Sequence, residues 1–95
     1  MRTQVLFSFL EAAEHDPRMA AVHISVYVSL FRRWCAGGGK DPVRFSRGEI
    51  MQGAKVRGRG TYHYCMRQLH ECGYIRYIPS HDPVRGSKVF LEGGP

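Results

Sequence analysis

The sequence SRGEIMQGAKVRGRGTYHYCMRQLHECGYIRYI, residues 46–78, contains two short helical patterns separated by a break that holds two glycines. Ser46 followed three residues later by Glu49 is a capping-box signature, so the first helix is predicted to begin at Ser46. Residues 56–60 end that helix, and a second one is predicted over residues 61–72. Its apolar side chains recur at helical spacing on one face: Tyr62, Cys65, Met66, Leu69 and Cys72.

Short strands are predicted on both sides of this helix pair. Downstream, Gly73 is the C-terminal glycine of the second helix, and residues 74–78 have the composition of a strand. A turn-rich loop at 79–86 leads to a returning strand at 87–91. Upstream, residues 42–45 alternate like a strand that is too short to exist without a sheet. These segments predict a three-stranded sheet whose last two strands form a hairpin.

Two further helices are predicted in the N-terminal third of the chain. The first covers residues 3–14, with Thr3 as a plausible N-cap. The second covers residues 20–35 and is apolar on two faces, so it is expected to be the central helix, packed from both sides. Leu69 and Phe31 are predicted core positions. One face of the central helix carries Ile24, Tyr27, Val28, Phe31 and Cys35, and the other Val22, Val26, Leu30 and Trp34.

The order of these elements is helix, helix, strand, helix, helix, strand, strand. Two short helices joined by a glycine turn form a helix-turn-helix, and a hairpin after the second helix is a wing. The characteristic segments are Ser46-Arg47-Gly48-Glu49-Ile50-Met51, Thr61-Tyr62-His63-Tyr64-Cys65, Leu69-His70-Glu71-Cys72-Gly73-Tyr74-Ile75, Pro79-Ser80 and Gly86-Ser87. Through them the chain resembles the winged helix-turn-helix family over residues 20–91, and is similar to small regulators or accessory proteins of bacterial conjugative and integrated elements. The resemblance implies a DNA-binding regulator of transcription or of element mobility.

The predicted fold class is therefore α+β, mainly α with a small antiparallel β wing, in the order α-α-β-α-α-β-β. The 95 residues (10.8 kDa) are expected to form one domain, 1–95, because chains usually divide only well beyond about 200 residues. Residues 3–35 are its helical N-terminal part, and residues 43–91 hold the helix-turn-helix and wing. An apolar share of 43% is enough for a single core.

Composition also limits the class of protein. No apolar run reaches the length of a membrane span, and the N-terminus does not have the pattern of a signal peptide. Three cysteines are an odd number without framework spacing, which favours reduced thiols in a cytoplasmic protein. A catalytic cleft is difficult to build in a chain this short, so an enzyme is not expected.

Positive charge is concentrated in the second half of the chain. Lys and Arg number 14 against 8 acidic residues, a net charge of +6. Residues 1–42 contain five basic and four acidic residues, whereas residues 43–95 contain nine and four. No acid occurs between Glu49 and Glu71. A solvated surface usually mixes both signs, so this excess predicts a polyanionic partner, and double-stranded DNA is the expected one.

The helix over residues 61–72 is predicted to enter the major groove. Arg59 and Thr61 are near its N-terminus, where an Arg can pair with guanine and a Thr can meet a thymine methyl. Lys55 and Arg57, beside the turn, suit phosphate contacts. Two cations flank the glycine turn of the wing and are expected to reach the backbone or the minor groove. The predicted DNA contacts are Lys55, Arg57, Arg59, Thr61, His63, Tyr64, Arg67, Arg85 and Lys88.

No cofactor or metal is expected. His63 and His70 lie on one face of the predicted helix, and Cys65 and Cys72 on another, so these four side chains cannot converge on one zinc ion. Two alternatives to a DNA-binding regulator remain open. One is a protein-interaction winged helix, such as a replication or partition scaffold whose basic face meets an acidic protein. The other is a metal-sensing repressor, which would require zinc to change its DNA affinity.

A homodimer is predicted through residues 3–35. One recognition helix contacts few base pairs, so specific binding commonly needs two copies. Phe7 lies off the apolar stripe of the first helix, and the second helix is apolar on two faces. Contiguous exposed apolar surface usually marks an interface. The alternative is that the first helix folds back over the second and leaves a monomer.

Overall fold

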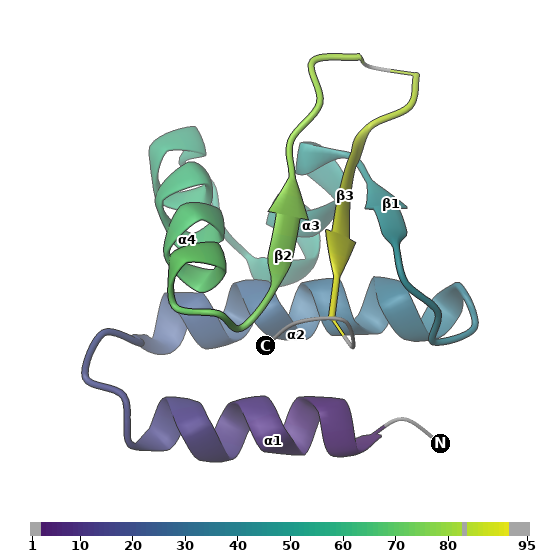
Figure 1. Ribbon diagram of the computed structural model, residues 1–95. Helices are drawn as coiled ribbons and strands as arrows, with labels where there is room; N and C mark the ends of the chain where they lie inside the picture. Colours follow the sequence, from purple (N-terminus) through teal and green to yellow (C-terminus); the bar gives the residue numbers. More distant parts are fainter. Residues whose placement is uncertain (1–2, 83, 92–95) are drawn as a thin grey trace.

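Four α-helices and a three-stranded antiparallel sheet make up residues 3–82 and 84–91, the part of the chain that this computed structural model describes (Figure 1). A mainly α-helical fold with a small antiparallel sheet is thus confirmed. Each element lies within two residues of its predicted bounds. The elements are α1 (Thr3–Glu14), α2 (Ala21–Ala36), β1 (Val43–Phe45), α3 (Arg47–Ala54), α4 (Arg59–Glu71), β2 (Arg76–Ile78) and β3 (Ser87–Phe90).

The capping box at the start of α3 forms as expected. Ser46 is the N-cap, its hydroxyl oxygen accepts from the Glu49 backbone N–H at 3.3 Å, and the Glu49 carboxylate accepts from the Ser46 N–H at 2.9 Å. The hydrogen bonds that the Glu49 carboxylate accepts from the Ser46 backbone N–H and hydroxyl, together with the nearby Arg33 guanidinium, lower the pKa of the Glu49 carboxyl. The start of α3 is thereby fixed beside β1, which ends one residue before Ser46.

The turn between α3 and α4 is shorter than the sequence predicts. Lys55 ends α3 in the left-handed conformation (φ 62°), and Gly58 is the N-cap of α4 in extended conformation. The prediction that residues 56–60 form the break is therefore wrong at its end, because Arg59 and Gly60 already belong to the first turn of α4. An N-cap residue does not have helical backbone angles, so Gly58 can occupy the position directly before α4.

The hairpin strands are shorter than predicted because the end of α4 uses two of their residues. Gly73 is left-handed (φ 83°), and the Tyr74 N–H donates to the Leu69 carbonyl at 2.9 Å, the Schellman arrangement. Strand β2 therefore begins at Arg76 rather than at residue 74. The sheet order is β1-β3-β2, so β3 is the central strand although it comes last in the chain.

The core lies between α2, α4 and the inner face of the sheet. Val26, Leu30 and Trp34 on α2 are fully buried, and so is Leu69 on α4, as predicted. Phe31 was predicted in the core as well, but it is only half-buried. It lies about 100° around α2 from Leu30, at the edge of the core against Trp34. On that predicted face of α2 only Tyr27 is buried, whereas Val28 and Cys35 are exposed.

Helix α1 runs along α2 on the side away from the sheet (Figure 1). The Phe9 ring of α1 stacks on Tyr27 of α2, with centroids 3.7 Å apart, and Ala13 is also buried. Phe7 points away from this contact and is 61% exposed. Within the described residues, no helix has both the length and the apolar character that crossing a membrane requires.

Candidate nucleic-acid interface

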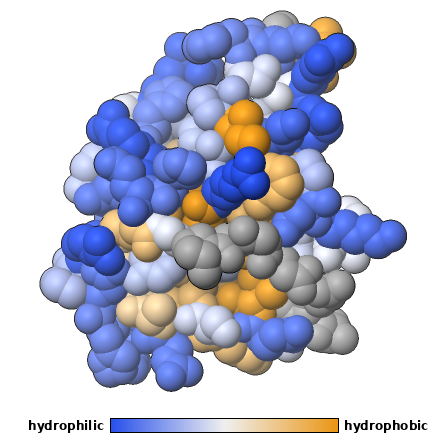
Figure 2. Space-filling view, in the orientation of Figure 1, coloured by the Kyte–Doolittle hydropathy of each residue, from blue (hydrophilic) through white to orange (hydrophobic). Residues whose placement is uncertain are grey.

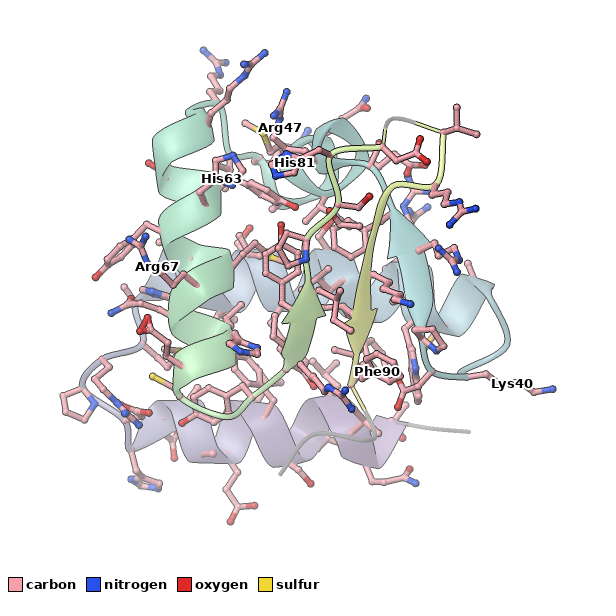
Figure 3. The ribbon with its side chains drawn as sticks, turned by 45° about the horizontal axis from the view of Figure 1, so that its top comes forward. Lys40, Arg47, His63, Arg67, His81 and Phe90 are labelled. Carbon is pink, nitrogen blue, oxygen red and sulfur yellow. The ribbon has the colours of Figure 1, made fainter. Side chains whose placement is uncertain are left out.

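Helix α4 has one buried face, and its remaining side chains form the exposed surface. Tyr62, Cys65, Met66 and Leu69 face the core. His63 and Arg67, one turn apart, are exposed and point away from it (Figure 3). Arg59 and Thr61 are exposed in the first turn of the helix, where backbone N–H groups are also free of helical partners.

A groove of about 850 Å³ lies between α4, the start of α3 and the β2–β3 loop. Its wall at α4 carries His63, Arg67 and His70, and the two other elements contribute Arg47 and His81. Figure 3 shows Arg47, His63 and His81 together at the end of the molecule where α4 begins. Three separate segments thus bring basic or ionisable nitrogen groups to one concave surface.

Two tyrosines, Tyr62 and Tyr77, also line this groove. Tyr62 is buried, and burial together with the neighbouring Tyr77 raises the pKa of its hydroxyl. Tyr77 is tied to α4 by its backbone N–H, which donates to His70 Nδ1 at 3.1 Å. Two of the groove's histidines are thus held beside its tyrosines, because the His63 ring also lies edge-on to Tyr62 with centroids 5.1 Å apart.

The structure brings only some of the predicted contact residues to this groove. His63 and Arg67 line it. Tyr64, by contrast, lies on the flank of α4 toward α2, with its ring centroid 5.8 Å from that of His23. Lys88 is half-buried in β3 and paired with Arg44 of β1 across the sheet. The other predicted contacts are exposed in the α3–α4 turn, the first turn of α4 or the β2–β3 loop: Lys55, Arg57, Arg59, Thr61 and Arg85.

Sequence reasoning missed three groove residues, Arg47, His70 and His81. Arg47 lies in the capping-box segment, and a side chain in the first turn of one helix of the pair can face the other helix. The sequence pattern excludes His70 as part of a zinc site and predicts no contact for His81. The spacing of His63, Arg67 and His70 along one helical face was the available signal, since residues three and four apart are neighbours.

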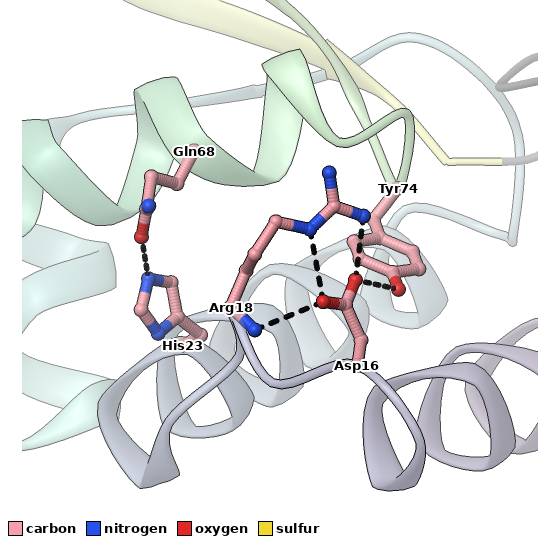
Figure 4. Close-up of polar contacts among 5 residues, drawn as sticks. All are labelled: Asp16, Arg18, His23, Gln68 and Tyr74. Atoms are coloured by element: carbon pink, nitrogen blue, oxygen red, sulfur yellow. Dashed lines mark hydrogen bonds and ion pairs between the residues drawn. The ribbon is translucent and has the colours of Figure 1, made fainter.

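The Gln68 side chain on α4 is engaged inside the molecule, against α2 (Figure 4). The Gln68 carbonyl oxygen pairs with His23 Nε2, and the Ala20 backbone N–H donates to His23 Nδ1 at 2.9 Å. His23 is only 3% exposed. With Nδ1 acting as acceptor, Nε2 carries the proton and donates to Gln68. This chain of hydrogen bonds attaches the start of α2 to the middle of α4.

A second polar cluster holds the end of α4. The Asp16 carboxylate accepts from the Arg18 guanidinium at 2.8 and 2.9 Å and from the Tyr74 hydroxyl at 2.6 Å (Figure 4). The hydrogen bonds from Arg18 and Tyr74 hold the pKa of this carboxyl well below its ordinary value. Both clusters position α4 relative to α1 and α2, so the exposed face of α4 has a fixed orientation.

Acidic side chains near the interface are few and paired. Glu71 Oε1 lies 3.9 Å from Arg67 Nε on α4, and Asp82 lies 3.8 Å from Arg85 in the loop. Both pairs are exposed, where such contacts contribute little. Among residues 3–82 and 84–91, no three His, Cys, Asp or Glu side chains are grouped as metal ligands. Cys65 is fully buried, and burial raises the pKa of its thiol.

Comparison with protein-family models, with curated proteins and with solved structures gives no match for this chain. Evidence about function therefore comes from the arrangement of residues in the chain itself. That arrangement is a helix with a basic exposed face, beside a groove whose rim carries further basic groups from α3 and from the β2–β3 loop.

Proposed function

We propose that this chain is a winged helix-turn-helix protein that binds double-stranded DNA and has no catalytic activity. In this proposal α3 and α4 are the helix-turn-helix, and the β2–β3 hairpin is the wing. The observation that carries the proposal is the convergence of exposed Arg and His side chains from α4, α3 and the hairpin on one face. A polyanion such as DNA is the partner whose charge matches that face.

Helix α4 is the element that we assign to the major groove. Its first turn presents Arg59 and Thr61, and His63 and Arg67 follow along the exposed side. A major groove about 12 Å wide admits one helix, and side chains on that helix distinguish base edges there. The α3–α4 turn and the hairpin loop then lie near phosphates on either side, where Lys55, Arg57 and Arg85 make contacts that do not depend on sequence.

The biological role that fits this activity is that of a transcriptional regulator or of an accessory protein of a mobile element, in the cytoplasm. A second copy of the chain is part of the proposal, because one helix contacts few base pairs. The exposed Phe7 of α1 and Val28 of α2 are the apolar residues assigned to that contact. The two α4 helices would then lie about 34 Å apart on an inverted repeat.

Alanine substitutions separate the two kinds of contact. Arg67→Ala or Arg59→Ala is expected to weaken binding to a preferred duplex by about 1–3 kcal/mol, with a smaller effect on unrelated duplexes. Arg57→Ala and Lys55→Ala should weaken all duplexes alike and reduce the salt slope by about one unit for each lost phosphate contact.

Fluorescence anisotropy with labelled duplexes, over a series of salt concentrations, measures both effects. Lys40→Ala is the matched control, since Lys40 is exposed in the loop after α2, outside the groove and outside residues 3–35, to which the dimer contact is assigned. If circular dichroism shows intact folding and the four groove and turn variants bind as the control does, the placement of α4 in the major groove is wrong.

A further inference from the structure

The outer face of the three-stranded sheet carries three cations from three different strands. Arg44 of β1 is directly opposite Lys88 of β3, and Lys88 is directly opposite Ile78 of β2. Arg76 of β2 points to the same side, because it is two residues from Ile78 and side chains alternate along a strand. Arg44 and Arg76 are exposed, and Lys88 is half-buried.

The Arg44–Lys88 pair is unfavourable in the absence of an anion. Side chains directly opposite each other in antiparallel strands have Cβ atoms about 5 Å apart, so like charges there repel. Throughout residues 3–82 and 84–91, no carboxylate forms an ion pair with Arg44, Arg76 or Lys88. The carboxylate of nearby Asp41 accepts from the Trp34 indole and the Leu91 N–H. The sheet thus holds a repulsive charge pair that a bound anion would relieve.

The Arg76 guanidinium is also held in place. It lies over the ring of Phe90, 4.9 Å from the ring centroid. An Arg that stacks on an aromatic ring keeps its charge at the surface. Because its side chain is already restricted, it loses less conformational entropy when it binds an anion. Figure 2 shows this side of the molecule as mostly hydrophilic around a small apolar area.

We infer that the outer sheet face, defined by Arg44, Arg76 and Lys88, is a second contact surface for the sugar-phosphate backbone of the same DNA duplex. This inference rests on the proposed function. The strands of the face lead directly into the β2–β3 loop, which the proposed function assigns to the backbone. Duplex DNA carries a charge about every 1.7 Å of its axis, so a duplex that continues past the loop offers phosphates to the sheet whatever its sequence.

The test compares two variants that each lower the net charge by two. Arg44→Gln/Arg76→Gln changes the sheet face. Lys40→Glu is the matched control, because Lys40 projects from the loop after α2, away from the sheet and outside residues 3–35 assigned to the dimer (Figure 3). Binding is measured by fluorescence anisotropy to a duplex selected for tight binding and to an unrelated duplex of equal length, over a range of salt concentrations.

The sheet variant is expected to lose affinity for both duplexes by the same factor, on the order of tenfold, and its salt slope should fall by about two units. Its preference for the selected duplex should stay unchanged. The control should keep the wild-type slope. Arg44→Lys/Arg76→Lys, which keeps both charges, should restore the slope. In low salt Arg44→Gln alone should melt no lower than the wild type, since it removes a like-charge pair and leaves the contact of Arg76 with Phe90 in place.

Three outcomes would overturn the inference. If the sheet variant and the Lys40→Glu control lose affinity equally, the effect comes from net charge and not from the sheet. If the sheet variant binds as the wild type does while Arg67→Ala loses its sequence preference, the second surface is wrong and the proposed function stands. If the wild-type chain binds neither duplex, the proposed function fails, and the inference that rests on it fails as well.

Discussion

The Asp16 side chain shows how single residues fix the orientation of α4. Its carboxylate joins the loop between α1 and α2 to Tyr74, which directly follows the end of α4, and its side chain is 8% exposed. Hydrogen bonds from Arg18 and Tyr74 lower the pKa of the Asp16 carboxyl below its ordinary value of 3.8. The folded chain therefore holds this proton less tightly than the unfolded chain, and the ionised carboxyl stabilises the fold.

We expect Asp16→Asn to lower the melting temperature at neutral pH. Because the folded pKa is depressed, the contribution of Asp16 is complete above about pH 5 and is lost progressively as the pH falls below the ordinary carboxyl pKa toward the lowered pKa of the folded chain. The difference in melting temperature between wild type and Asp16→Asn should be constant from about pH 5 to 8 and should narrow below about pH 4. Glu11→Gln, at an exposed position on α1, is the control. A difference that does not change with pH would contradict this account.

At the scale of residues, helical spacing alone predicted part of the interface. His63 and Arg67 follow from the apolar face of α4, because the residues opposite that face must be exposed. Arg47 and His81 reach the same groove only through tertiary structure, since they come from α3 and from the hairpin loop. The burial of Gln68 against His23 could not be predicted either, because the two residues are 45 positions apart in the chain.

At the scale of elements, α3 packs against α2 through Gly53. A Cβ atom at Gly53 would lie 2.5 Å from the Ser29 hydroxyl oxygen. That hydroxyl is buried and donates to the Ile50 carbonyl at 3.0 Å. Gly48 is on the same helix, and a Cβ there would meet no atom within 4 Å. A side chain is therefore expected to fit at Gly48 and to clash at Gly53, although both glycines are in the same short helix.

We expect Gly53→Ala to lower the free energy of unfolding by about 1–3 kcal/mol, because the methyl group displaces a buried, hydrogen-bonded side chain. Gly48→Ala should instead raise it by up to about 1 kcal/mol, since Ala favours a helix more than Gly does. Urea denaturation followed by circular dichroism measures both values. If both substitutions stabilise the chain, the close approach of α3 to α2 is incorrect.

Element types were predictable because periodicity, capping residues and helix-ending glycines agreed along the chain. The boundaries of the elements were less predictable where two elements compete for the same residues. Residues 74 and 75 have strand composition, but they serve the Schellman turn after α4. Gly58 was interpreted as part of a break, whereas the left-handed residue in that turn is Lys55, which no glycine pattern indicates. The predicted core position of Phe31 is wrong for a related reason. Both faces of α2 are apolar in sequence, so the pattern does not show which of them is buried.

At the scale of the whole molecule, charge is separated between two ends. The α1 helix and the loop after it contain Glu11, Glu14 and Asp16, whereas residues 43–91 contain nine of the 14 basic residues. If the chain binds DNA as we propose, negative charge at the α1 end opposes contact of α1 with the duplex, so α4 is expected to face it. The proposed contact with a second copy is through the same α1 end.

Phe7 and Val28 remain exposed although α1 lies along α2. We expect sedimentation equilibrium at micromolar concentration to show a dimer, and Phe7→Ser to shift it toward the monomer by removing apolar contact area. Ser8→Ala, at the neighbouring exposed position, should leave the equilibrium unchanged. A single species of 10.8 kDa, both alone and with a DNA site, would exclude the homodimer.

The most direct test of a DNA-binding function is a comparison of two duplexes with the wild-type chain. The first duplex is selected from a random pool by repeated binding, and the second is a scrambled version with the same composition. We expect the chain to prefer the selected duplex by about a thousandfold, with affinity that falls steeply as salt rises. Equal affinity for both duplexes would contradict sequence-specific recognition, and no measurable affinity for either would contradict DNA binding altogether.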